Sequence, residues 1–173
     1  LNIKDKIYLY NLNYKDFSIS KKKFIPKDLV IKETENDIVE NNDNFLVINK
    51  KAGLPVQGGT KVKDNVVNIL TNSIYFKDEK PFIVHRIDKD TSGLLIVAKN
   101  RETAQQITSL FRIKKIYKTY LAISIGQTDK KKDIIDNSLI RYDGKKKILE
   151  RATTNYELLD TNKIYSLFKL KPI

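Results

Sequence analysis

The most constraining feature of the sequence is the segment from His85 to Lys99, in which a charged stretch leads directly into an apolar run. The charged part contains the only His of the chain and ends at the turn-forming residues Thr91-Ser92-Gly93. The apolar part, Leu94 to Ala98, has the length and composition of a buried strand. This order is typical of a loop that presents side chains and of a core strand that anchors it. The sequence therefore predicts that this loop is the chemical centre.

The composition indicates a globular protein with a basic surface. The chain has 173 residues, 40% hydrophobic and 31% charged, which suffices for one sizeable core. Its 33 basic and 21 acidic residues give a net charge of +12, which fits a polyanion binder or simply a basic surface. With no Cys and one His, disulfides and Cys- or His-rich metal sites are excluded. No apolar run approaches the roughly 20 residues of a membrane span, and no signal-peptide pattern is visible.

Periodicity and turn residues predict an α+β fold with a mixed, mainly antiparallel sheet and flanking helices. Strands are predicted at 45–48, 94–98, 117–126 and 164–173, with a short candidate at 7–10. Residues 57–60 form a predicted glycine loop. Helices are predicted after Asp64 and after Asn100, whose side chains can accept a hydrogen bond from the first helical turn. Because strands outnumber helices in an irregular order, α+β is favoured over a doubly wound α/β fold.

Asp88 is the leading candidate for a catalytic group. It lies between Arg86 and Lys89, and nearby cations favour the ionised carboxylate that a nucleophile or base requires. The alternative is a loop Asp that makes a turn or a surface ion pair. Asp90 is the second candidate. His85 has no evident Ser partner, so a Ser–His–Asp hydrolase is not expected.

Several other side chains are suited to RNA. The forked guanidinium of Arg86 can hold a phosphate or stack on a base, although a structural salt bridge fits as well. Tyr120 alternates with small residues on one face of its strand and could stack on a base, with ordinary core packing as the alternative. Lys115 and Lys118 lie close to Tyr117 and Tyr120. That interleaving fits RNA, but a basic helix end on a solvated face fits nearly as well.

These residues together resemble the large-subunit rRNA pseudouridine synthases of the RluA/RluC/RluD type, over residues 36–173. Residues 85–95 resemble the family signature His-Arg-Leu-Asp-x-x-Thr-Ser-Gly-Leu-Leu. Residues 45–56 resemble the strand and loop of the motif Asn-Lys-Pro-x-Gly-Leu, with Lys51 in place of the Pro. Residues 118–122 resemble the motif Lys-x-Tyr-x-Ala. The Gln57-Gly58-Gly59 stretch is most similar to the RluC branch.

The resemblance implies the isomerisation of specific uridines to pseudouridine in 23S rRNA, without a cofactor or a metal. Asp88 would be the catalytic nucleophile, at C1′ of the ribose or at C6 of the ring. Arg86 would fill the RNA stack when the target base is flipped out, because a planar cation can occupy the gap. Tyr120 would pack on the uracil and accept a proton. RNA contacts are also expected from His85, Lys50, Lys115 and Lys118.

The resemblance also predicts how the chain is organised. Residues 34–173 would be the N-terminal part of the catalytic domain. Residues 1–33 would be a linker with the end of an S4-type RNA-binding domain. Family members continue into a Thr-Gly-Arg motif whose Arg pairs with the catalytic Asp, so we expect residues 1–173 alone to be inactive. A cytoplasmic monomer that acts on large-subunit rRNA is expected. The alternatives are a tRNA substrate and a non-catalytic RNA-binding or ribosome-assembly protein on the same scaffold.

Overall fold

The computed structural model describes residues 25–58, 64–77, 79–144 and 146–173. These residues divide into two compact units. The first unit comprises the residues up to Pro81 together with Arg86–Val97. The second unit comprises Phe82–His85 and Ala98–Ile173. The strand candidate at 7–10 and part of the predicted glycine loop lie outside the described residues, so those two predictions stay predictions.

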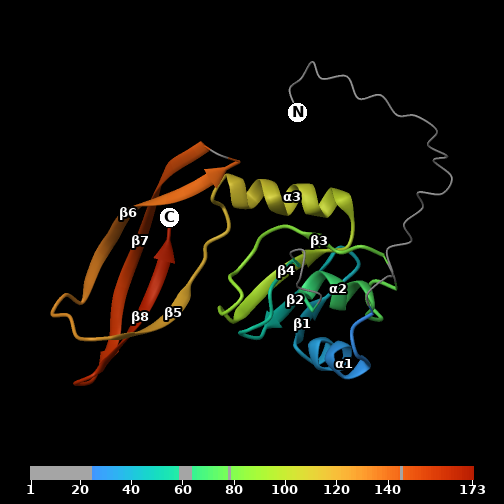
Figure 1. Cartoon of the computed structure of the whole chain (residues 1–173), viewed down its shortest axis with the longest axis horizontal. Coiled ribbons are helices and arrows are strands. Elements are labelled where there is room, and N and C mark those ends of the chain that lie inside the picture. The colour runs from blue at the N-terminus through green and yellow to red at the C-terminus, as the bar shows by residue number, and fades with distance from the viewer. Residues whose placement is uncertain (1–24, 59–63, 78, 145) are drawn as a thin grey trace, which may run out of the picture. The chain divides into compact units, whose positions relative to one another are not determined.

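The first unit is built on strands with an apolar core. Its elements are α1 (Asp28–Asn36), β1 (Ile38–Asn41), β2 (Phe45–Lys50), α2 (Val66–Thr71) and β4 (Gly93–Ala98), shown in Figure 1. β1 and β2 pair in antiparallel fashion. Leu46 and Ile48 on β2 and Leu95 and Val97 on β4 are at most 1% exposed. Alternate residues of each strand therefore enter one core, as the period of two in a strand requires.

The first helix of this unit, α1, takes in residues 28–33. At the second helix the cap differs from the sequence prediction. The cap of α2 is Asn65 rather than Asp64, because the Asn65 side chain accepts a hydrogen bond from the Asn68 amide at 3.0 Å. Asn65 is 2% exposed, and this bond satisfies a polar group that would otherwise be costly to bury.

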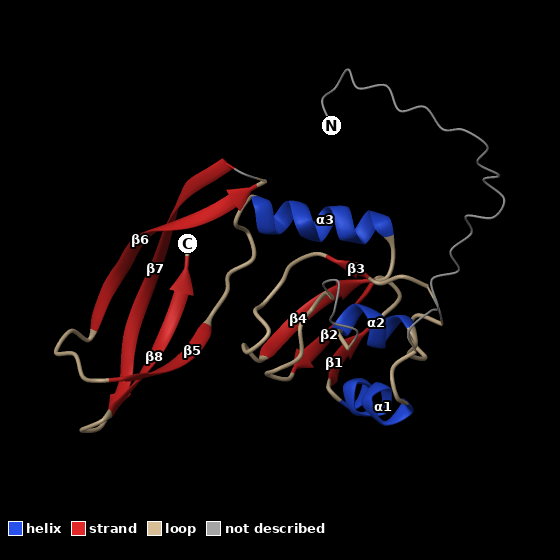
Figure 2. Cartoon of the chain, in the orientation of Figure 1, coloured by secondary structure: helices blue, strands red, loops and turns tan. Residues whose placement is uncertain are grey.

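The second unit contains β3 (Phe82–Ile83), α3 (Arg101–Arg112), β5 (Tyr120–Ile125), β6 (Lys132–Asp143), β7 (Lys146–Thr161) and β8 (Tyr165–Pro172), as Figure 2 shows. In the first unit the strands are ordered β1-β2-β4, and the four-stranded sheet of the second unit has the order β5-β8-β7-β6. All three pairings of the second sheet are antiparallel. Asn100 caps α3 by accepting a hydrogen bond from the Thr103 amide at 2.9 Å, which confirms the predicted cap.

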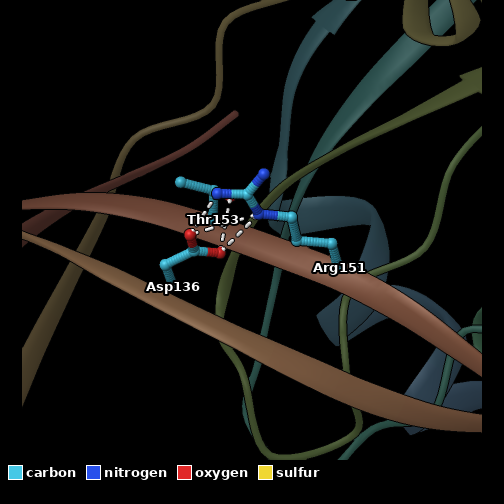
Figure 3. Close-up of polar contacts among 3 residues, drawn as sticks. All are labelled: Asp136, Arg151 and Thr153. Atoms are coloured by element: carbon cyan, nitrogen blue, oxygen red, sulfur yellow. Dashed lines mark hydrogen bonds and ion pairs between the residues drawn. The ribbon is translucent and has the colours of Figure 1, made fainter.

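The long β6–β7 hairpin was not predicted from the sequence. Nearly every residue of β6 is exposed, and its sequence, KDIIDNSLIRYD, lacks the strict alternation of apolar and polar residues that marks a half-buried strand. Side chains on one face of the hairpin bind each other instead. The Arg151 guanidinium forms a forked ion pair with the Asp136 carboxylate, which also accepts a hydrogen bond from the Thr153 hydroxyl (Figure 3).

The fold class agrees with the sequence prediction. Helices are few, strands are many, and every pairing described above is antiparallel, so the α+β class with a mainly antiparallel sheet is confirmed. Within the described parts of the chain, no helix is long and apolar enough to cross a membrane.

Candidate functional site

The candidate catalytic loop is exposed and is closed by a backbone turn. Arg86, Asp88 and Asp90 are all exposed to solvent. The Thr91 amide donates a hydrogen bond to the Asp88 carbonyl at 3.2 Å, which closes a turn over residues 88–91. β4 begins at Gly93, whose φ of +121° lies in a region that favours glycine. The loop thus presents its charged groups to solvent while its end is fixed to a core strand.

Lys50 lies at the end of β2 and is buried, with 1% of its surface exposed. Its ammonium donates three hydrogen bonds to backbone carbonyls, at 2.9 Å to Lys51, 2.8 Å to Leu54 and 3.0 Å to Lys89. A lysine ammonium has three N–H donors. All three therefore go to carbonyls of this chain, and the ammonium is not available to a phosphate of RNA. The prediction that Lys50 contacts RNA is corrected accordingly.

Lys50 instead connects two loops that are far apart in the sequence. The Lys89 carbonyl accepts hydrogen bonds both from Lys50 and from the Gly53 amide, the latter at 2.9 Å. Burial lowers the pKa of Lys50, and the charges of Asp90 and Asp88 act in the opposite direction. The structure thus brings together a buried cation and the two carboxylates that the sequence singled out.

In the second unit, His85 packs against an aromatic ring. The centroids of the His85 and Phe111 rings are 4.5 Å apart. The pKa of His85 is lowered from 6.5 to about 4, first because the ring is desolvated and then because of the positive charge of Lys118. The imidazole is therefore neutral near pH 7, so any contact with RNA would use a hydrogen bond or the ring face rather than a charge.

Tyr120 is the first residue of β5 and is half-buried. Its register partner on β8 is Leu170, and that of Ala122 is Phe168. These residues share one face of the sheet, since partners in a ladder and alternate residues along a strand point the same way. Phe168 also meets the Tyr156 ring edge to face, with centroids 5.4 Å apart. Tyr120 therefore lies on an apolar and aromatic face.

Two further lysines predicted to contact RNA, Lys115 and Lys118, are exposed in the segment between α3 and β5. The Lys115 amide donates to the Leu110 carbonyl at 2.9 Å, so its backbone completes the end of the helix while its side chain stays in solvent. Of the predicted residues, the structure brings Lys50 close to Asp88 and Asp90, and His85 close to Lys118.

Sequence reasoning missed two groups that shape this region. Phe111 near the end of α3 belongs to none of the motifs singled out from the sequence, yet its ring packs against His85. The Lys89 carbonyl, which receives two hydrogen bonds, gives no signal in the sequence, because every residue has a carbonyl.

Comparisons with known proteins agree with this description. The family of RNA pseudouridylate synthases matches residues 44–173. Ribosomal large subunit pseudouridine synthase C of Rickettsia conorii is 38% identical over 99 residues, which cover 57% of this chain and 32% of that protein. An uncharacterized RNA pseudouridine synthase of Haemophilus influenzae is 34% identical over 149 residues, covering 80% of this chain and 62% of that protein.

A solved structure of a pseudouridylate synthase has a fold similar to that of this chain. Human RNA pseudouridylate synthase domain containing 4 has a TM-score of 0.68 and 26% identity, with 83% of this chain and 61% of that chain covered. The chain belongs to the RNA pseudouridylate synthase family. It spans between about a third and two thirds of the length of these relatives.

Proposed function

We propose that the protein isomerises uridine to pseudouridine in large-subunit ribosomal RNA, with Asp88 as the nucleophile. The observation that carries the proposal is an exposed Asp on a loop whose backbone is bonded to a core lysine, in a chain of this family. Relatives named ribosomal large subunit pseudouridine synthase C support ribosomal RNA as the substrate.

The proposed reaction transfers no group to or from the RNA. The Asp88 carboxylate attacks C1′ of the ribose or C6 of the uracil, and the bond between N1 and C1′ breaks. The uracil then turns and forms a bond between its C5 and C1′, and the bond to Asp88 breaks, which regenerates the carboxylate. The proton on C5 is lost and N1 is protonated. No electrons enter or leave, so the product is an isomer of the substrate.

Three further roles complete the proposal. Arg86 enters the RNA stack where the target uridine leaves it, since a planar guanidinium can stack between bases. Tyr120 packs on the uracil and accepts the proton. His85, Lys115 and Lys118 contact the RNA around the target, with the net charge of +12 supporting attraction to phosphate. The same proposal places the protein in the cytoplasm as a monomer.

A pair of matched substitutions tests the nucleophile. Asp88→Asn and Asp90→Asn each remove one negative charge from the same exposed loop. In the complete protein we expect Asp88→Asn to abolish pseudouridine formation, measured by release of tritium from C5-labelled uridine. RNA affinity should persist in both variants, and Asp90→Asn should keep most of the turnover. Turnover retained by Asp88→Asn, or lost equally in both variants, would falsify the assignment.

A further inference from the structure

The second unit contains a cavity of about 410 Å³ on its four-stranded sheet. Side chains from three strands line it, among them Lys132, Ile134, Asn155, Glu157, Lys169 and Lys171. We call this the lysine cavity. Its volume lies within the roughly 300–1,000 Å³ typical of sites that bind small molecules or parts of larger ligands.

The strand register places the cations of the lysine cavity on one face. Glu157 of β7 lies between Lys132 of β6 and Lys169 of β8, and Asn155 is the partner of Lys171. Successive residues of a strand point to opposite faces. Lys169 and Lys171 therefore point away from the face that carries their neighbour Leu170, which is the face of Tyr120.

The lysine cavity has more positive than negative charge. Lys132 forms an ion pair with Glu157 at 2.9 Å. Among the described residues, no carboxylate lies within ion-pair distance of Lys169 or Lys171. The pKa of Glu157 is lowered, chiefly by its hydrogen bond with Lys132 and to a lesser degree by the charges of Lys169 and Lys171. One carboxylate is thus shared by three ammonium groups.

Arg151 and Lys130, by contrast, are already paired. Arg151 binds Asp136 (Figure 3), and Lys130 binds Asp133 at 2.6 Å. Asp133, which also lines the lysine cavity, is therefore neutralised by its own partner. Within the cavity the surplus positive charge lies on Lys169 and Lys171, because the neighbouring Glu157 carboxylate is already in an ion pair with Lys132.

We propose that the lysine cavity binds the phosphate backbone of RNA. The inference rests on the proposed function for the identity of the polyanion. Because Lys169 and Lys171 lie on the face opposite to Tyr120, the phosphates they bind are not those next to a uracil packed on Tyr120. They belong to a second segment of a large folded RNA. The cavity would thus favour long substrates over isolated stem-loops.

Two variants that change the charge of the cavity in opposite directions test this site in the complete protein, with an in vitro transcript of large-subunit rRNA as the probe. Lys169→Gln with Lys171→Gln removes the two unpaired ammonium groups. Each phosphate contact contributes about 0.7–0.9 to the slope of log K against log salt, so losing two should lower the slope by about 1.4–1.8 and weaken binding roughly 25- to 60-fold at 0.1 M salt. Glu157→Gln leaves Lys132 unpaired and should strengthen binding.

The matched control is Lys146→Gln with Lys147→Gln, which removes the same charge from exposed positions of β7 outside the cavity. We expect it to change the slope and the affinity much less. Equal losses in the two double variants, or a slope unchanged by Lys169→Gln with Lys171→Gln, would overturn the proposal. If that double variant does not fold, the Glu157→Gln variant decides instead. An RNA affinity equal to or weaker than that of the unaltered protein would then overturn the proposal. Pseudouridine formation by the unaltered protein is scored separately, so failure of the proposed function is distinguishable.

Discussion

The buried ammonium of Lys50 gives the sharpest prediction about stability. Lys50→Met keeps most of the aliphatic stem but removes the three hydrogen bonds to the carbonyls of Lys51, Leu54 and Lys89. A hydrogen bond from a charged group contributes about 1.5–3 kcal/mol, so the three together contribute roughly 4.5–9 kcal/mol. Part of this is offset, because burying an ammonium is itself costly. We therefore expect the free energy of unfolding to fall by about 3 kcal/mol.

The neighbouring residue provides the control. Lys51 is exposed and forms an ion pair with Asp37 at 3.2 Å, and such surface pairs contribute at most about 1 kcal/mol. Urea unfolding of the complete protein should therefore show a small effect of Lys51→Met and a large one of Lys50→Met. By thermal unfolding, about 3 kcal/mol corresponds to a fall in Tm of roughly 6–12 °C for a domain of this size.

Hydrogen exchange locates the effect of Lys50→Met within the fold. The amides of Gly53 and Thr91 both donate to carbonyls of the Asp88–Lys89 segment. Their exchange should accelerate in Lys50→Met more than that of the β2 amides. A loss of stability no greater than that of Lys51→Met, or unchanged exchange at these two amides, would refute the argument that the ammonium holds the loop.

Three further predictions concern single side chains. Tyr120→Phe keeps the ring but removes the hydroxyl, so the rate of pseudouridine formation should fall more than RNA affinity does; equal losses would indicate a role in binding alone. NMR titration of His85, the only His of the chain, should give a pKa near 4, and Lys118→Gln should raise it. Because the folded pKa lies below the unfolded value of about 6.5, the stability associated with the neutral ring is present above that pH and is lost as the pH falls through about 4. Asn100→Ala removes the cap of α3 and should cost about 0.5–2 kcal/mol in urea unfolding, whereas Asn100→Asp should cost much less.

The sequence predicted the parts of the fold in which local chemistry decides the structure. The strand at Leu94–Ala98 and the cap at Asn100 were both predicted, because apolar runs and short amides have local consequences. The shift of the α2 cap from Asp64 to Asn65 is a single-residue error, as expected where two adjacent residues can both cap a helix.

Features that depend on distant parts of the chain could not be predicted in this way. Lys50 was expected to contact RNA, and only the convergence of carbonyls from residues up to 39 positions away makes it a core residue. The β6–β7 hairpin lacks a buried face that could impose a period of two. The faces of the second sheet became known only from its register, which assigns Tyr120 and Lys169 to opposite sides.

The Lys89 carbonyl accepts two hydrogen bonds, and this affects the entropic cost of binding a substrate. Ordering the backbone of one residue costs about 1–2 kcal/mol of conformational entropy. In a loop whose carbonyls at Asp88 and Lys89 are already bonded, this cost is met when the protein folds and not when RNA arrives. This part of the loop is therefore preorganised, and under the proposed function more of the binding energy would be available for extracting the base.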